Sequence, residues 1–317
     1  MRNKSLLLLF IGLFLSKFSV AQQDPEFTQF MENKMYYNPA YAGVEGVSKL
    51  SLLVRSKWTG YTGTFDDGGA PTTEVLTMSA PIYKLNSGFG AYIINDNLGT
   101  LNTLALMGSY AYHVAVKDAK LSFGVSGGFY SQSIDFDNYR ANNPDDPLLL
   151  NGQQTQFRGD MGAGVFYQAK KLYGSISVSH LLNPSFSYGS DVLRNSLEPT
   201  LYLMGGYDYD ITYNLELTPS LLVQSDFNEY LINLGAIVTY NNKFWGGLTY
   251  KYLESASLIA GMSLLKSNAL QISYGFDYIV HNQQAKQATS NEIRMSYALP
   301  INPFGSRKVV RTPRFRH

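Results

Sequence analysis

The feature that most constrains this chain is a period-two alternation of apolar and polar residues, repeated along most of its length. In the first such segment Leu50, Leu52 and Val54 fall on one face, while Ser51 and Arg55 fall on the other. This spacing is typical of a β-strand with one apolar and one polar face. Fourteen segments show it: 49–57, 73–80, 88–93, 103–113, 121–129, 160–168, 172–179, 201–209, 215–226, 231–240, 244–252, 256–264, 269–278 and 292–299.

Alternation alone does not separate a transmembrane barrel from a soluble β-sandwich, but the polar face and the loops do. The polar face is mostly Ser, Thr, Gly and Gln, and charged residues make up only 15% of the chain, against roughly 25% in ordinary soluble domains. Long connections at 59–71, 132–154, 182–199 and 280–290 all follow odd-numbered segments, whereas connections after even-numbered segments are short. Short turns at one end and longer loops at the other are typical of an outer-membrane barrel.

Tyrosines at the ends of the apolar face favour the same interpretation. Ten of them fall near strand ends, as expected for the aromatic girdles at the two membrane interfaces: Tyr110, Tyr112, Tyr167, Tyr207, Tyr209, Tyr240, Tyr250, Tyr252, Tyr278 and Tyr297. The predicted fold class is therefore all-β, an antiparallel transmembrane outer-membrane β-barrel of about 14 strands. We expect its N- and C-termini to face the periplasm.

The first 21 residues have the pattern of a secretory signal peptide. Arg2 and Lys4 form a basic head, residues 6–15 are almost wholly apolar, and Ser19-Val20-Ala21 is a small-x-small cleavage site. The apolar run is shorter than the ~20 residues of a membrane helix. We expect cleavage after Ala21 and four regions in the chain: the signal peptide (1–21), an N-terminal segment (22–48), the barrel (49–299) and a basic C-terminal tail (300–317).

The N-terminal segment is rich in aromatic residues yet keeps neither a helical nor a strand period. One interpretation is a periplasmic leader whose Pro25 and Pro39 prevent pairing at a sheet edge. The other is a plug or collar that packs inside or beneath the barrel, which we favour because so many aromatic side chains are costly to leave in water.

Composition and motifs give no support for catalysis, a cofactor or nucleic-acid binding. The chain has no Cys, four His and a net charge of +1, so thiolate metal sites and a pervasive basic surface are both excluded. Neither a nucleophile–His constellation nor a phosphate-binding glycine loop is recognisable. Calcium binding by Asp135, Asp137, Asp145 and Asp146 is conceivable, but the ligand spacing of an EF-hand is missing. We expect no enzyme activity, no cofactor and no metal.

Residues spread over the mature chain resemble the PorP/SprF family of Bacteroidota outer-membrane proteins. The N-terminal matches are Asp24, Pro25, Phe27, Gln29, Met31, Asn38, Pro39, Ala40, Tyr41 and Gly43, and the next are Arg55, Trp58 and Gly60. Downstream matches include Gly88, Gly90, Gly124, Asp160, Gly164, His180, Trp245 and Asp277. One departure is Asn291, which stands where the family often has a His before Glu292.

The resemblance implies a partner protein of the type IX secretion and gliding-motility machinery. Members of this family help to secrete and anchor large cell-surface adhesins, which carry a C-terminal sorting domain, and some are linked to periplasmic components of the machinery. The implied partners are therefore a secreted adhesin, secretion components and outer-membrane lipid. The alternative left open is a general or substrate-specific outer-membrane pore, and lumen content would separate the two, because a pore needs an unblocked channel.

Three further regions carry open alternatives. Arg55 and Trp58 are expected near the outer end of the first strand, as a lumen charge and an interfacial aromatic residue. The loops at 59–71 and 132–154 are either solvated surface or contacts for the adhesin. The tail contains Arg307, Lys308, Arg311, Arg314 and Arg316, and is either a disordered basic tail or a docking segment for an acidic periplasmic partner or lipid head groups.

Overall fold

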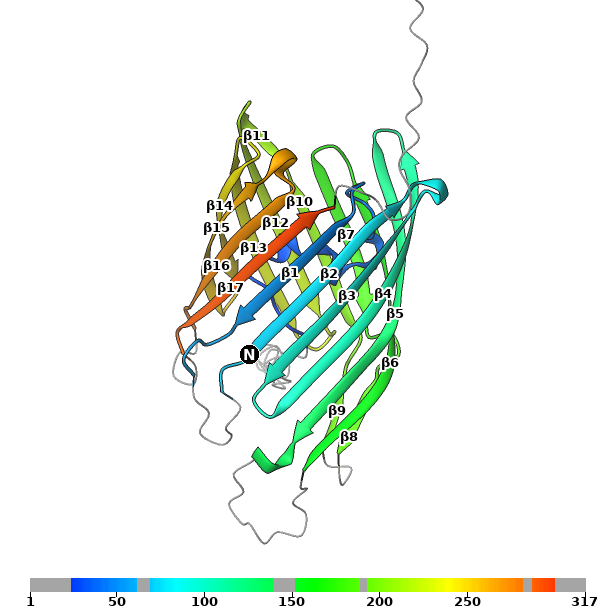
Figure 1. The fold of residues 1–317 in the computed structure, drawn as a ribbon, viewed down its shortest axis with the longest axis vertical. Helices are drawn as coiled ribbons and strands as arrows, with labels where there is room; N and C mark the ends of the chain where they lie inside the picture. Colours follow the sequence, from blue (N-terminus) through cyan, green and yellow to red (C-terminus); the bar gives the residue numbers. More distant parts are fainter. Residues whose placement is uncertain (1–23, 62–68, 139–151, 189–192, 282–286, 300–317) are drawn as a thin grey trace, which may run out of the picture.

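The computed structural model describes residues 24–61, 69–138, 152–188, 193–281 and 287–299, in which antiparallel strands close into one barrel (Figure 1). The barrel has 14 strands because β10 and β11 are successive parts of one strand, both paired with β12. Its strands are β1 (Lys49–Ser56), β2 (Thr72–Ile82), β3 (Ser87–Leu98), β4 (Leu101–Val116), β5 (Ala119–Asp135), β6 (Gln153–Gln168), β7 (Leu172–Ser179), β10 (Thr200–Tyr207), β11 (Tyr209–Thr212), β12 (Leu215–Ser225), β13 (Tyr230–Tyr240), β14 (Phe244–Lys251), β15 (Ser255–Leu264), β16 (Leu270–Ile279) and β17 (Thr289–Ala298).

The remaining elements are short. A hairpin of β8 (Ser185–Tyr188) and β9 (Leu193–Ser196) lies outside the barrel sheet. The helical turns are η1 (Phe30–Glu32), α2 (Lys34–Tyr37), η2 (Pro39–Tyr41), η3 (Tyr83–Leu85), η4 (Phe136–Asn138) and η5 (Lys266–Asn268). None of the helices in the described part of the chain is long and apolar enough to cross a membrane.

The predicted barrel of 14 antiparallel strands is confirmed, with three differences in detail. Strands β3 to β6 are longer than their alternating segments, because pairing continues into polar residues such as Gln153 and Gln154. The predicted strand over 201–209 is interrupted at Asp208, whose N–H donates to the Lys171 carbonyl. The predicted loop at 182–199 contains the β8–β9 hairpin, which alternation did not reveal.

The alternation divides the barrel wall as the sequence predicts. On β1, Leu50, Leu52 and Val54 face outward and stay exposed on the protein surface, whereas Leu53 and Arg55 face inward and are buried. Most of the predicted girdle tyrosines are likewise exposed on the outer face: Tyr110, Tyr112, Tyr167, Tyr207, Tyr209, Tyr240, Tyr250, Tyr252 and Tyr278. An apolar outer face of this kind is suited to lipid rather than water.

The two ends of the barrel differ. We call the end with the tight β4–β5, β6–β7 and β13–β14 turns the short-turn end, and the opposite end the long-loop end. The barrel begins and finishes at the short-turn end, where Lys49 pairs with Ala298. Strands β4, β5 and β6 extend further toward the long-loop end than β1 and β17 do (Figure 1). That the short-turn end faces the periplasm stays a prediction.

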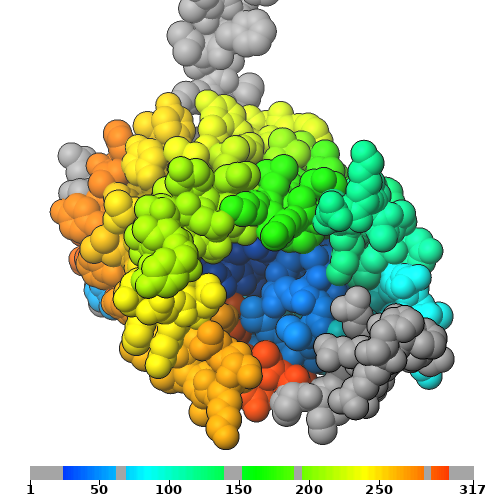
Figure 2. All heavy atoms as spheres, turned by 90° about the horizontal axis from the view of Figure 1, so that it is seen from above, coloured from blue at the N-terminus to red at the C-terminus, as the bar shows by residue number. Residues whose placement is uncertain are grey.

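Residues 24–48 lie inside the barrel, and we call them the N-terminal plug. Its side chains include many of the most buried in the protein: Phe27, Thr28, Gln29, Phe30, Tyr37, Asn38, Ala40 and Ala42 are each at most 1% exposed. Seen from the short-turn end, the hollow of the barrel ends on this segment, drawn in blue (Figure 2). The plug therefore occupies the space that a channel would need.

Glycines in the wall allow the plug backbone to approach the strands. A Cβ at Gly124 of β5 would lie 2.2 Å from the backbone N of Ala40. Gly43 adopts φ +73°, a left-handed conformation that favours glycine, and a Cβ there would lie 2.7 Å from the Cα of Gly88. The Gly43 N–H also donates to Ser79 Oγ at 2.8 Å. At these points the plug and wall touch backbone to backbone.

This fit predicts that Gly124→Ala loosens the plug without harming the barrel. The added methyl group overlaps the Ala40 backbone, and overpacking of this kind costs about 1–3 kcal/mol. We expect faster proteolysis of the plug in the folded barrel. Gly127→Ala on the same strand is the matched control, because Gly127 faces outward and its nearest contact is 3.9 Å away. Equal proteolysis of the two variants would contradict the fit.

Candidate functional site: the charged contacts that hold the plug

The plug is held first by an ion-pair cluster on β1, β16 and β17. Arg55 Nη2 lies 2.5 Å from Asp277 Oδ2, and Arg55 Nη1 lies 3.0 Å from Glu292 Oε2. All three side chains are almost fully buried in the lumen. Arg55 and Glu292 are also direct cross-strand partners where the first and last strands of the barrel meet. The cluster therefore lies on the seam that closes the sheet.

The plug backbone completes this cluster. The N–H groups of Thr28 and Gln29 donate to Glu292 Oε2 and Oε1, both at 2.9 Å. The Thr28 hydroxyl donates to Asp277 Oδ1 at 2.5 Å and accepts from Arg55 Nη1 at 2.5 Å. One guanidinium against two carboxylates leaves a negative excess, and backbone N–H donors stabilise such an excess where water is absent. The carboxylates on the wall thus recognise the plug by its main chain.

A second charged contact holds the beginning of the plug. His180, directly after β7, lies between two carboxylates: Nδ1 is 2.7 Å from Asp160 Oδ2, and Nε2 is 3.0 Å from Asp24 Oδ1. The Tyr202 hydroxyl donates to the other Asp24 oxygen. Both imidazole nitrogens therefore face acceptors, which is the arrangement expected of a protonated histidine.

The pKa values in this contact follow from its geometry. Burial by itself lowers the pKa of His180, but the charges and hydrogen bonds of Asp24 and Asp160 outweigh it and raise the pKa to about 10. Burial by itself raises the pKa of the Asp24 carboxyl, but His180 and the Tyr202 hydroxyl bring it below its ordinary value. Asp24 and His180 therefore form a true ion pair at neutral pH.

Two looser ion pairs match further acidic plug residues to basic wall residues. Lys251 Nζ lies 3.5 Å from Glu26 Oε2, and Arg294 Nη2 lies 3.4 Å from Glu32 Oε2. Lys251, Glu26 and Arg294 are nearly fully buried, so these are lumen contacts and not surface pairs. Three acidic plug residues, Asp24, Glu26 and Glu32, thus each face a cationic group of the wall.

Uncharged contacts fix the middle of the plug. Asn38 caps η2 by accepting from the Ala40 N–H at 2.8 Å, and its amide donates to the Val165 carbonyl of β6 at 3.0 Å. Phe27 packs edge-on against Tyr36 and Tyr37, with ring centroids 5.2 and 6.2 Å apart. These contacts give the irregular segment one defined conformation.

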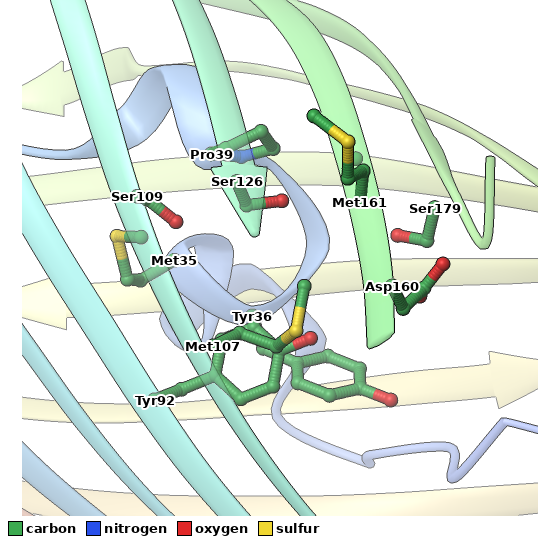
Figure 3. A pocket seen from close by; sticks show the side chains of 11 residues that line it. Met35, Tyr36, Pro39, Tyr92, Met107, Ser109, Ser126, Asp160, Met161 and Ser179 are labelled. Carbon is green, nitrogen blue, oxygen red and sulfur yellow. The ribbon is translucent and has the colours of Figure 1, made fainter. Parts of the chain in front are cut away.

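The lumen beside the plug is filled or only narrowly open. Met35 and Pro39 of the plug, together with Ser109, Ser126 and Asp160 of the wall, line a space of about 10 Å³. Figure 3 shows these side chains around it. Two cavities near Asp24 hold about 170 and 120 Å³. Typical small-molecule pockets are ~300–1,000 Å³, so no lumen cavity among these is of that size.

The structure brings most of the sequence-predicted site residues into one place. Those of the N-terminal segment all belong to the plug: Asp24, Pro25, Phe27, Gln29, Met31, Asn38, Pro39, Ala40, Tyr41 and Gly43. Arg55 contacts the plug, whereas Trp58 and Gly60 lie beyond the end of β1. The Trp58 N–H donates to Ser290 Oγ there at 3.0 Å.

Other predicted residues stand apart from the plug or cannot be placed. Asp135 and Asp137 accept hydrogen bonds within their own loop, from Asn138 and from the Gly152 N–H. Asp145, Asp146 and the basic tail residues Arg307, Lys308, Arg311, Arg314 and Arg316 lie outside the described residues, so their predicted roles stay predictions. Among the described residues, no group of three or more His, Asp or Glu side chains could hold a metal ion.

Sequence reasoning missed the wall side of this site. Asp160, His180 and Asp277 matched the family pattern but were given no role, and Lys251 and Arg294 were not singled out. One signal was available. Ionisable residues within membrane strands are costly and pair with one another or line a function.

The comparisons with known proteins agree with this architecture. Residues 19–297 match the family described as type IX secretion system membrane protein PorP/SprF. No match was found among the curated proteins.

Among solved structures, the Ralstonia pickettii toluene transporter TbuX is 13% identical, with a TM-score of 0.50 over 83% of this chain and 92% of that one. A TodX deltaS2S3 mutant, described as a monoaromatic hydrocarbon channel, is 11% identical, with a TM-score of 0.51 over 83% and 93%. A Pseudomonas aeruginosa FadL homologue is 13% identical, with a TM-score of 0.45 over 82% and 92%. At these identities the likeness to the first two structures concerns the fold alone.

The seam cluster predicts that Arg55→Met strongly destabilises the plugged barrel. Removing the guanidinium leaves Asp277 and Glu292 buried without their ion-pair partner, and breaking a buried pair in this way costs about 3–5 kcal/mol. Urea unfolding of the protein in lipid vesicles measures the change. Lys57→Met is the control. It removes a partly exposed cation just after the same strand, 3.5 Å from Glu254, and should cost clearly less stability than Arg55→Met. Similar losses in both variants would contradict a special role for Arg55.

The His180 contact predicts a pH dependence of plug docking. Because the pKa of His180 in the folded protein, about 10, lies above its ordinary value of 6.5, the contribution of this contact to plug docking is complete below pH 6.5. It declines as pH rises through that interval and is lost above about pH 10. Plug protection against protease, measured from pH 6 to 10.5, should fall in the wild type. In His180→Gln the plug should be less protected at pH 6, and the protection should not show the decline that comes from His180 losing its proton. A pH profile equal to that of the wild type would contradict this role of His180.

Proposed function

We propose that this chain, which belongs to the PorP/SprF family of type IX secretion system membrane proteins, receives a secreted cell-surface adhesin through its C-terminal sorting domain, helps to secrete it and anchors it at the cell surface. The protein is an integral outer-membrane β-barrel with a role in type IX secretion. In this proposal it acts as a binding partner and not as an enzyme. A link to periplasmic secretion or gliding components belongs to the same proposal.

The observation that supports a binding role is the filled lumen. A barrel of 14 strands is wide enough either to conduct or to be filled, and here the plug is held by buried charges from β1, β14, β16 and β17. Such a network is expensive to break, because each separated charge stays in a site of low polarity. A protein kept closed in this way is suited to hold a client at one end.

The second candidate is an outer-membrane pore for small solutes. It is favoured only by the cavities near Asp24, which together open part of the long-loop half of the lumen. A pore would need the plug to move or leave. The same plug therefore discriminates the two candidates: conduction must increase when the plug is removed, whereas adhesin retention depends on the closed protein.

The test is a mild-detergent purification of the tagged protein from its native outer membrane, followed by mass spectrometry. We expect one large secreted protein with a C-terminal sorting domain to co-purify. The control is a strain in which that sorting domain is deleted, and recovery should fall at least tenfold there. Recovery of the barrel alone, with single-channel conductance in lipid bilayers, would instead support the pore.

A further inference from the structure

The half of β6 toward the long-loop end is paired with a neighbouring strand on one side only. β5 pairs with β6 along its whole length, from Gln153 to Gln168. On the other side β7 pairs with it only from Ala163 to Gln168. Residues 153–160 therefore have no strand on their second side among the described residues, and we call them the β6 edge.

The chain turns away from this edge immediately after β7. The Leu181 N–H donates to the Met161 carbonyl at 3.0 Å, and among the described residues no later backbone N–H or carbonyl is hydrogen-bonded to the β6 backbone. His180 and Asn183 adopt φ +57° and +45°, left-handed conformations that redirect the chain, and Pro184 follows. The local sequence thus ends the pairing at a defined residue.

The direction of the free backbone groups follows from the Met161 contact. Because backbone groups alternate between the two sides of a strand, residues of the same parity as Met161 direct theirs to the edge. These are Thr155, Phe157 and Gly159. The Phe157 carbonyl accepts from the neighbouring Arg158 Nη1 at 2.8 Å. No partner for the three N–H groups is present in the part of the chain that the structure describes.

The β8–β9 hairpin covers the inner face of β6 and not its edge. It is reached by side chains that point into the barrel: Arg158 Nε donates to the Ser185 carbonyl at 2.7 Å, and Gln156 Nε2 donates to the Ser187 carbonyl. Phe186 and Tyr188 of β8 are fully buried. Phe157 on the outer face is 67% exposed. The edge is left between a covered polar face and an exposed apolar one.

An edge of this kind is a template for another strand. Unpaired backbone groups are costly near the hydrocarbon region of a membrane, and extended peptides add to exposed edges through main-chain hydrogen bonds. We propose that the β6 edge binds an extended segment of a partner protein as an added β-strand. Its apolar side chains lie beside Phe157, and its polar or acidic side chains lie beside Arg158. With the secreted adhesin as the partner, this inference rests on the proposed function.

A second copy of this chain fits the edge less well. Two barrels in one membrane are related by rotation about the membrane normal, so their β6 strands run in the same direction. Barrel strands are tilted by roughly 35–45°, and the rotation gives the two edges opposite tilts, so they diverge. An extended segment has no such constraint and can follow eight residues of the edge.

Proline substitutions test the edge with little disturbance of the barrel. Thr155→Pro removes one edge N–H, whereas Thr155→Val keeps it and loses only the hydroxyl contact with Ser133. Gln156 has the opposite parity, so Gln156→Pro breaks the β5 ladder and shows what damage to the fold looks like. Migration of unheated samples in detergent gels reports whether each barrel is closed.

The decisive measurement is hydrogen–deuterium exchange over residues 153–160, on protein extracted with its native partners and again after they are stripped off. One added hydrogen bond is worth about 1 kcal/mol, so we expect exchange at the edge amides to become at least about fivefold faster on stripping. Wild type and Thr155→Val should show this change, and Thr155→Pro should show little.

The other outcomes contradict either strand addition at the β6 edge or the adhesin as its partner. Slow exchange before and after stripping means that the chain covers its own edge, and fast exchange in both means that nothing binds there. Mass spectrometry of the stripped fraction distinguishes a failure of the β6-edge inference from a failure of the proposed function. If the adhesin is recovered equally with Thr155→Pro and Thr155→Val, the proposed function is still supported, but the β6 edge is not its binding site. If a protein without a sorting domain protects the edge amides, strand addition at the β6 edge is supported, but the adhesin is not the partner.

Discussion

The structure depends on how charge is kept inside a barrel whose outside is apolar. Arg55, Asp277 and Glu292 face the lumen from three strands and are shielded from bulk water by the plug. Carboxylates buried in this way need donors, and the guanidinium alone does not supply enough. The N–H groups of Thr28 and Gln29 make up the difference, so the plug is part of the electrostatic balance of the wall and not merely a filler.

Shape and charge act on different parts of the plug. Its first residues are acidic and face Arg or Lys side chains or His180 of the wall, which fixes their position through directional contacts. Its later residues, from Asn38 to Gly43, contain few charges and lie against glycines such as Gly88 and Gly124. Close backbone contact of this kind fixes the position of these plug residues, because larger side chains or a shifted backbone would clash with the wall. A segment with no regular secondary structure thereby acquires a single location.

Much of this architecture was predictable because its causes are local. Each strand alternates against lipid on one side and lumen on the other, so every one of the 14 segments could be read independently of the rest. The misses have the opposite character. The β8–β9 hairpin has strands of four residues that do not face lipid, and the polar start of β6 has no apolar alternation. The contact between Asp24 and His180 joins residues 156 positions apart, which no local pattern reports.

The position of the Arg55 cluster on the seam bears on the order of assembly. The plug is synthesised before any barrel strand, yet two of the carboxylates that bind it belong to β16 and β17, among the last strands made. This part of its binding site does not exist until the first and last strands have met, whereas the contacts with Gly88, Gly124 and Val165 are made with strands synthesised earlier. The Thr28–Gln29 part of the plug can therefore dock only after the sheet has closed, so its docking marks that closure is complete. A chain truncated before β17 would lack the Glu292 carboxylate, so the N–H groups of Thr28 and Gln29 would lose their acceptor.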